Sequence, residues 1–189
     1  MAVVDTGGLR KGLTLEVDNE LVRVIEYQHV KQGRGSAFVR LTMRNLRTGS
    51  TTERTFQAGS KFTVARLERQ TIQYLYRDGD DFHFMDTETF EQFSLPADVL
   101  GNAVNYLKEN DSIDLLTYQG KPIDVEIPVT ATLRIEQTDP GLRGDTATGG
   151  TKPATLETGL VVSVPLFLNE GDLIKVDTRT GQYLERVAG

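Results

Sequence analysis

Apolar and polar residues alternate along most of this chain. The clearest alternation lies between residues 37 and 46, where the order is Val39, Arg40, Leu41, Thr42, Met43 and Arg44. Successive side chains of a strand point to opposite faces, so a period of two predicts a strand. We expect this strand to have one buried apolar face and one basic face in water.

The preceding segment supplies a partner for this strand. Residues 21–30 are rich in β-branched and aromatic residues and predict a second strand. Residues 31–36 separate the two and contain Gly33-Arg34-Gly35. The pair therefore predicts a long hairpin with Arg34 at its tip. A strand rises about 3.3 Å per residue, so an arm of about ten residues reaches roughly 30 Å.

Similar patterns continue to the end of the chain. Turns rich in glycine, proline and aspartate separate further strands, expected at residues 51–56, 70–77, 81–86, 112–118, 123–127, 131–137, 160–164, 173–177 and 183–187. Pro96 begins the one expected helix, which runs toward Leu107, since proline is favoured in a first helical turn. Residues 139–153 are rich in glycine and threonine and predict a loop. Many short strands separated by turns indicate an all-β fold of small barrels.

The charges divide the chain into three parts. The net charge is −6, but the N-terminal third carries +5, the middle third −9 and the C-terminal third −2. With the rhythm of strands and turns, this division predicts three domains, at residues 1–65, 66–128 and 129–189. Charges are screened beyond about 10 Å in 0.1 M salt, so a polyanion would respond to the basic third. A basic face exposed to water without a partner explains these charges equally well.

No catalytic constellation is recognisable in the sequence. The chain has no cysteine, which excludes a disulfide framework and cysteine-ligated zinc. His29 and His83 lie on expected strands without neighbouring ligands, so we expect packed or solvated side chains. The turn with Asp78, Asp80 and Asp81 lacks the glycine and closing glutamate of a calcium loop. With no signal peptide and no apolar run of about 20 residues, we expect a soluble cytoplasmic protein.

Two segments remain as candidate binding sites. In the hairpin tip, glycines on both sides leave the Arg34 guanidinium free to make forked contacts with phosphates and bases. Taken alone, a turn with a solubilising arginine is the simpler interpretation. In residues 141–152, glycines would let backbone amides approach a ligand, and Arg143, Asp145 and Thr146 offer donors and acceptors. A loop without a ligand explains this segment as well.

These segments belong to a set of motifs that resembles the elongation factor P family. The motifs lie at residues 26–29, 31–37, 53–56, 84–86, 143–146, 152–171 and 175–183. The resemblance therefore covers essentially the whole chain. It implies an N-terminal SH3-like, or KOW-like, barrel followed by two oligonucleotide-binding (OB) barrels in an elongated, L-shaped arrangement.

The resemblance also implies a function on the ribosome. Proteins of this family bind beside the peptidyl-tRNA and stimulate peptide-bond formation at consecutive-proline stalls. The implied contacts are Arg34 with the acceptor end of the tRNA, supported by Lys31, Gly33 and Gly35, and Gly144, Asp145 and Thr146 with the exit-site codon of the mRNA. It implies no catalytic residue, metal or cofactor. We expect a monomer that does not bind membranes.

The tip departs from the commonest pattern of the family. Many relatives carry a lysine there, often after Pro-Gly, and modify it with β-lysine, whereas this chain has Arg34 and Gln32. Some arginine-bearing relatives are rhamnosylated, but their tip lacks Gly-Arg-Gly, so modification of Arg34 is left open. Two other functions stay open as alternatives. The first is the elongation factor P-like paralogue, against which the Gly33-Arg34-Gly35 tip and residues 144–146 argue. The second is a scaffold protein that uses its OB folds for protein contacts, and it predicts no association with ribosomes.

Overall fold

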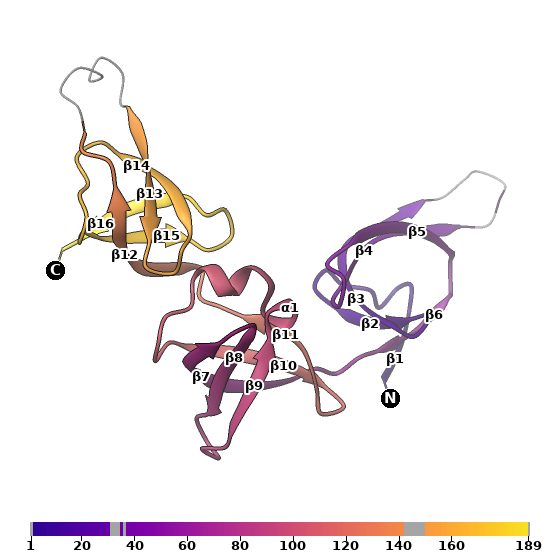
Figure 1. The fold of residues 1–189 in the computed structure, drawn as a ribbon. Coiled ribbons are helices and arrows are strands. Elements are labelled where there is room, and N and C mark those ends of the chain that lie inside the picture. Colours follow the sequence, from indigo (N-terminus) through magenta and orange to yellow (C-terminus); the bar gives the residue numbers. More distant parts are fainter. Residues whose placement is uncertain (1, 31–34, 36, 142–149, 189) are drawn as a thin grey trace. The chain divides into compact units, whose positions relative to one another are not determined.

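The fold is all-β and contains three sheets (Figure 1). The computed structural model describes residues 2–30, 35, 37–141 and 150–188. These residues form two compact units, which consist of residues 1–70 with 115–124 and of residues 71–114 with 125–189. Each unit is considered by itself.

The first sheet has six strands in the order β1-β6-β2-β3-β4-β5. Their bounds are β1 (Ala2–Asp5), β2 (Thr14–Val17), β3 (Glu20–Val30), β4 (Phe38–Asn45), β5 (Thr51–Gln57) and β6 (Lys61–Val64). The sheet curls around a core to which β3 and β4 contribute most of the buried side chains, namely Val22, Val24, Val39, Leu41 and Met43. Arg40 and Arg44 on the other face of β4 are exposed, which confirms the predicted alternation.

Three strands of this sheet were not predicted. β1, β2 and β6 have four residues each, too few for a clear alternation. β1 obtains its partner from the far end of the domain, because Ala2 lies opposite Val64 and Asp5 opposite Lys61. Pairing between distant segments makes β1 and β6 strands, whereas β2 also pairs with β3, which follows it directly in the sequence.

The second sheet has five strands in the order β11-β10-β7-β8-β9. Their bounds are β7 (Glu68–Asp78), β8 (Asp81–Asp86), β9 (Gln92–Pro96), β10 (Ser112–Tyr118) and β11 (Lys121–Glu126). The predicted acidic turn is present, with Asp78 opposite Asp81 and Gly79 at a φ of +60°. β9 was not predicted.

The predicted helix from Pro96 to Leu107 is wrong in its extent. The structure has a four-residue α1 (Ala97–Leu100) and then a 3-10 segment, η1 (Gly101–Asn105). Pro96 ends β9 and caps α1 instead of lying in its first turn. Gly101 has a φ of +52°, which is outside the helical region and stops α1 after one turn.

The third sheet has five strands in the order β14-β13-β12-β15-β16. Their bounds are β12 (Thr130–Thr138), β13 (Thr151–Leu156), β14 (Val161–Pro165), β15 (Leu173–Asp177) and β16 (Tyr183–Val187). β13 begins inside the predicted loop at residues 139–153, so that prediction is wrong at its end. Pro153 has no N–H to donate to a neighbouring strand. The register of β13 with β12 starts only at Ala154, so this N–H is not needed there. The Pro153 carbonyl accepts a hydrogen bond from Thr138 Oγ1 at 2.9 Å.

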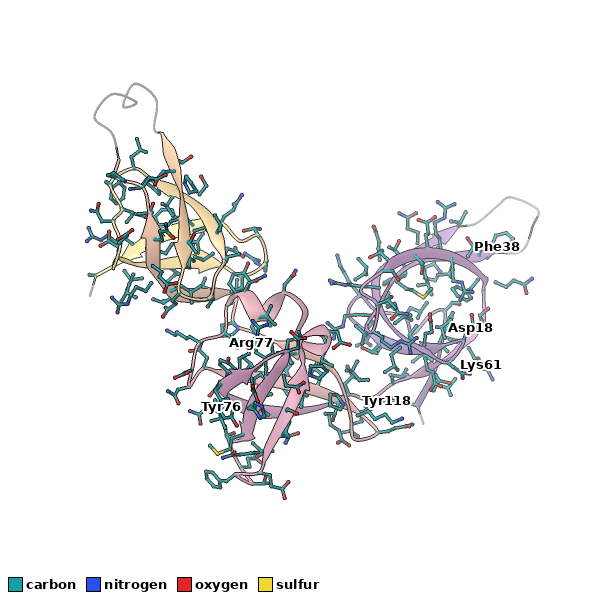
Figure 2. The ribbon with its side chains drawn as sticks, viewed as in Figure 1. Asp18, Phe38, Lys61, Tyr76, Arg77 and Tyr118 are labelled. Atoms are coloured by element: carbon teal, nitrogen blue, oxygen red, sulfur yellow. The ribbon has the colours of Figure 1, made fainter. Side chains whose placement is uncertain are left out.

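The first unit includes the hairpin turn between β10 and β11. Tyr118, labelled in Figure 2, donates a hydrogen bond from its hydroxyl to Glu16 Oε2 at 3.3 Å. Desolvation and the neighbouring Glu16 carboxylate raise the pKa of Tyr118, so the hydroxyl keeps the proton that it donates. Gln119 and Gly120 both have a positive φ, as a two-residue hairpin turn requires.

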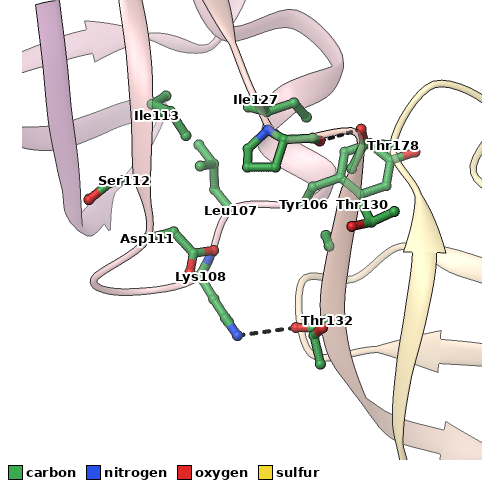
Figure 3. Close-up of a pocket in the computed structure, with 12 residues that line it drawn as sticks. Tyr106, Leu107, Lys108, Asp111, Ser112, Ile113, Ile127, Thr130, Thr132 and Thr178 are labelled. Atoms are coloured by element: carbon green, nitrogen blue, oxygen red, sulfur yellow. Dashed lines mark hydrogen bonds between the residues drawn. The ribbon is translucent and has the colours of Figure 1, made fainter. Parts of the chain in front are cut away.

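The second unit places Tyr106 in the core of the third sheet. This ring is 7% exposed and packs in a cluster with Leu133, Leu156 and Ile174. A cavity of about 220 Å³ lies beside it (Figure 3). Two hydrogen bonds span the cavity wall, from Lys108 Nζ to the Thr132 carbonyl at 3.1 Å and from Thr178 Oγ1 to the Pro128 carbonyl at 2.6 Å.

Candidate nucleic-acid interface

The β3–β4 hairpin leaves the core of the first sheet toward its outer end, where the described strands stop. Its outermost described pair is Val30 opposite Phe38, and Figure 2 shows Phe38 at the outer end of β4. Toward this end the side chains of β3 from Glu26 to His29 are all exposed, while Val39 of β4 is still buried. Tyr27 and His29 support each other here through an edge-to-face contact with ring centroids 5.9 Å apart.

Most of the predicted tip lies outside the described residues. Lys31, Gly33 and Arg34 belong to that part, so their predicted contacts stay predictions. Gly35 is described as an exposed bend residue. The described strands therefore fix where the tip segment starts and ends, at Val30 and Phe38.

The outer face of the hairpin carries the basic residues. Arg23 of β3 and Arg44 of β4 are directly opposite each other, and Gln28 is opposite Arg40 farther out. Arg40 Nε lies 3.4 Å from Glu53 Oε1 on β5, in an exposed ion pair that contributes little to stability. Like charges at opposite positions of an antiparallel pair are destabilising, so this pair suits the face to an anionic partner.

Sequence reasoning missed Arg23 as part of this basic face. Val22 and Val24 on either side of it are buried, and this alternation could have placed Arg23 on the outer face. Its position opposite Arg44 depends on the register, which has a shift between Val24 and Glu26.

The second predicted segment leaves the third sheet between β12 and β13. Gly144, Asp145 and Thr146 lie outside the described residues, so their contact with mRNA also stays a prediction. Both ends of the segment are described. Thr138 N donates to Glu170 Oε1 at 3.3 Å. A Cβ on Gly141 would lie 2.5 Å from the Leu166 carbonyl oxygen, so only glycine fits there without movement of the backbone.

A buried lysine joins the two ends of this segment. Lys152 is 7% exposed, and its Nζ donates to the Asp139 carbonyl at 2.5 Å. A buried ammonium needs such partners, because desolvation of an unpaired charge is costly. Lys152 therefore holds the chain before the segment against the strand after it, a role that sequence reasoning did not assign to it.

The described residues offer no arrangement for metal binding. No three histidine, cysteine, aspartate or glutamate side chains in the described ranges come together to hold a metal ion. His83 stacks on Tyr76 with ring centroids 4.4 Å apart, and His29 packs against Tyr27, so both histidines have aromatic neighbours. None of the described helices is long and apolar enough to cross a bilayer.

Three family models match successive parts of the chain. They are the elongation factor P KOW-like domain at residues 5–62, the elongation factor P OB domain at residues 67–125 and the elongation factor P C-terminal domain at residues 131–186. The chain is 54% identical to elongation factor P from Moorella thermoacetica, over 97% of this chain and 100% of that protein. It is also 54% identical to elongation factor P from Pelotomaculum thermopropionicum, over 98% and 100%.

Solved structures of a more distant kind share the fold. The eukaryotic translation initiation factor 5A from Methanococcus jannaschii matches with a TM-score of 0.55 at 23% identity, over 66% of this chain and 94% of that one. A translation initiation factor eif-5a family protein from Naegleria fowleri matches with a TM-score of 0.52 at 16% identity, over 67% and 98%. At such identities the likeness concerns the fold alone.

Proposed function

Because the chain belongs to the elongation factor P family, we propose that it binds the ribosome beside the peptidyl-tRNA and stimulates peptide-bond formation at consecutive-proline stalls. Membership makes it a translation elongation factor and not an enzyme. The observation that carries the proposal is the full-length similarity, with all three family domains in order along the chain. We further propose a monomer that acts in the cytoplasm, without cofactor or membrane.

The proposed contacts are assigned to three domains, at residues 1–65, 66–128 and 129–189. Three separate sheets and the three family matches support this division. The first domain presents Arg34 to the acceptor end of the peptidyl-tRNA, with Lys31, Gly33 and Gly35 supporting the tip. The third domain presents Gly144, Asp145 and Thr146 to the exit-site codon of the mRNA.

The physical contribution of the factor is orientation of the peptidyl-tRNA. Proline has a fixed φ and a restricted ring, which disfavours the geometry for peptide transfer. Holding the acceptor end in place reduces the entropy that is lost before attack. A guanidinium is suited to this task, since it binds phosphate or ribose through planar, forked hydrogen bonds.

Reconstituted translation of a message with three consecutive prolines tests the proposal. A charge-assisted hydrogen bond contributes about 1.5–3 kcal/mol, so Arg34→Ala should slow peptide-bond formation about ten- to hundredfold. A proline-free message is the control, and the Tm should stay unchanged. Equal rescue by Arg34→Ala and the unchanged protein would show that Arg34 is a solvated turn residue. A protein scaffold would not associate with ribosomes at all.

An arginine-tip subtype, with or without modification, is part of the same proposal. The mass of the intact protein from its native cells reports directly whether Arg34 carries a rhamnose. Arg34→Lys keeps the charge but loses the planar fork. We expect partial rescue by Arg34→Lys if charge alone matters, and none if a modifying enzyme must recognise arginine.

A further inference from the structure

An exposed aromatic ring lies in the turn that follows β14. Phe167 is 62% exposed, whereas the next residue, Leu168, is fully buried in the core of the third sheet. Single exposed apolar residues are common on protein surfaces and mean little by themselves. What distinguishes Phe167 is its position beside the segment that carries residues 144–146.

The turn lies against both ends of that segment. At the first end, Gly141 approaches Leu166 so closely that a Cβ would lie 2.5 Å from the Leu166 carbonyl oxygen. At the second end, Thr151 is directly opposite Pro165, which precedes Phe167 by two residues. Phe167 therefore lies at the same end of the third sheet as both ends of the segment.

Hydrogen bonds hold the backbone around Phe167 in place. The Phe167 carbonyl accepts a bond from Asn169 Nδ2 at 3.3 Å, and Asn169 N donates to Asp172 Oδ2 at 2.8 Å. Leu168 N donates to the Pro165 carbonyl at 3.2 Å. Because the backbone is held and the ring is in solvent, little conformational entropy is lost when a partner covers the ring.

The charges of this turn disfavour contact with phosphate. Residues 165–172 contain two carboxylates and no lysine or arginine. Glu170 Oε1 accepts a hydrogen bond from Thr138 N at 3.3 Å. Asp172 Oδ1 lies 2.7 Å from Arg186 Nη2, and this pair adds no net positive charge. Carboxylates repel the RNA backbone, so a nucleic acid would approach the ring with a base and not with a phosphate.

Single-stranded RNA offers a partner that fits such a ring. Bases outside a helix expose their π faces, and proteins bind them by stacking aromatic side chains on them. The proposed contact of residues 144–146 would bring the exit-site codon of the mRNA next to this turn. Stacking tolerates every base, since each base has a π face.

We propose that Phe167 stacks on an unpaired base of the mRNA, at the exit-site codon or at the nucleotide directly before it. The inference rests on the proposed function and adds to it a binding residue outside residues 144–146. The ring contributes affinity through the base alone, so this contact adds nothing to the salt dependence of binding.

Three substitutions separate stacking from other uses of an apolar side chain. Phe167→Ala should weaken binding of the full-length protein to proline-stalled ribosomes about tenfold, as for the loss of one stacked base. Its Tm and its slope of log affinity against log salt should be unchanged. Phe167→Trp should bind at least as tightly as the unchanged protein, because it keeps an aromatic face. Phe167→Leu should bind as weakly as Phe167→Ala, because it keeps only the apolar character.

Val161→Ala is the matched control for the loss of exposed apolar surface. Val161 is 60% exposed and begins β14, at the opposite end of that strand from Phe167. The variant should bind stalled ribosomes like the unchanged protein.

Messages that lack a single base test the partner directly. Stalled complexes are assembled on mRNAs with an abasic nucleotide at one position of the exit-site codon or directly before it. At one of these positions, the missing base should weaken binding of the unchanged protein about tenfold more than binding of Phe167→Ala. The two changes remove the same contact there, so their effects are not additive.

Four results would each overturn the stacking proposal alone. They are full affinity of Phe167→Ala, full affinity of Phe167→Leu, an equal loss with Val161→Ala, and additive losses at every abasic position. If the unchanged protein failed to bind stalled ribosomes on intact messages, the proposed function would fall with it.

Discussion

Arg23 of β3 and Arg44 of β4 are directly opposite each other on the outer face of the hairpin that leads to Arg34. Like charges opposite each other in an antiparallel pair reduce stability by roughly 0.2–1 kcal/mol. The buried neighbours Val22, Val24 and Met43 require this alternation, so both arginines must face outward. A hairpin selected for stability alone would carry opposite charges here, and a bound anion would relieve the repulsion.

Arg44→Gln should therefore raise the Tm slightly and weaken ribosome binding. Each lost phosphate contact reduces the slope of log affinity against log salt by about 0.7–0.9. Thermal unfolding and ribosome binding at several salt concentrations measure both effects. Arg54→Gln on β5 of the same sheet is the control. The Arg54 Nη1 atom lies 2.7 Å from Asp18 Oδ2, so Arg54 already has an anionic partner and its replacement should leave the salt slope unchanged. An unchanged slope with Arg44→Gln would remove this face from the RNA interface.

Asp145→Ala should weaken the rescue of proline stalls about ten- to hundredfold, which corresponds to the loss of one charge-assisted hydrogen bond. Fold and Tm should be unaffected. Asp139→Ala is the matched control outside the proposed contact, because Asp139 uses its backbone carbonyl, not its carboxylate, to bind Lys152. Rescue assays on several stalling messages make the comparison. Equal rescue by both variants would exclude residues 144–146 from the functional site.

Tyr106→Ala should lower the free energy of unfolding of the second unit by about 3–4 kcal/mol. The ring is buried among side chains of the third sheet, and its removal leaves a cavity beside the one already present. Urea unfolding provides the measurement. Phe167→Ala in the same unit removes an aromatic ring that is 62% exposed and should change stability by less than about 0.5 kcal/mol. Similar effects of the two changes would show that Tyr106 is not part of this core.

Asp177 should make the third sheet sensitive to acid. Hydrogen bonds from the Arg179 side chain, and then from its backbone N–H, lower the pKa of Asp177 from 3.8 to about 2. Since the folded pKa is depressed, the stabilisation is present above pH 3.8 and is lost as the pH falls through about 2. Thermal unfolding between pH 2 and 5 should show a smaller pH dependence for Asp177→Asn and for Arg179→Gln. Parallel curves for all three proteins would contradict this assignment.

The strands with strong alternation could be predicted from the sequence alone. β4, β15 and β16 depend on local periodicity and on glycine turns such as Gly49 and Gly181, both at positive φ. For the same reason the all-β class follows from the pattern. The candidate site also follows from sequence, because Gly33-Arg34-Gly35 and Gly144-Asp145-Thr146 are short contiguous motifs.

What depends on distant partners needed the tertiary structure. β1 and β6 become strands because they pair across the whole first domain. β13 contains Pro153 and is a strand because it pairs with β14 on one side and with β12 on the other. The opposition of Arg23 and Arg44 follows from a register that includes a shift. The left-handed backbone of Phe90 follows from the hydrogen bonds of a buried Asp86. Periodicity reports which face of a strand is buried, but only the folded chain decides which residues meet across it.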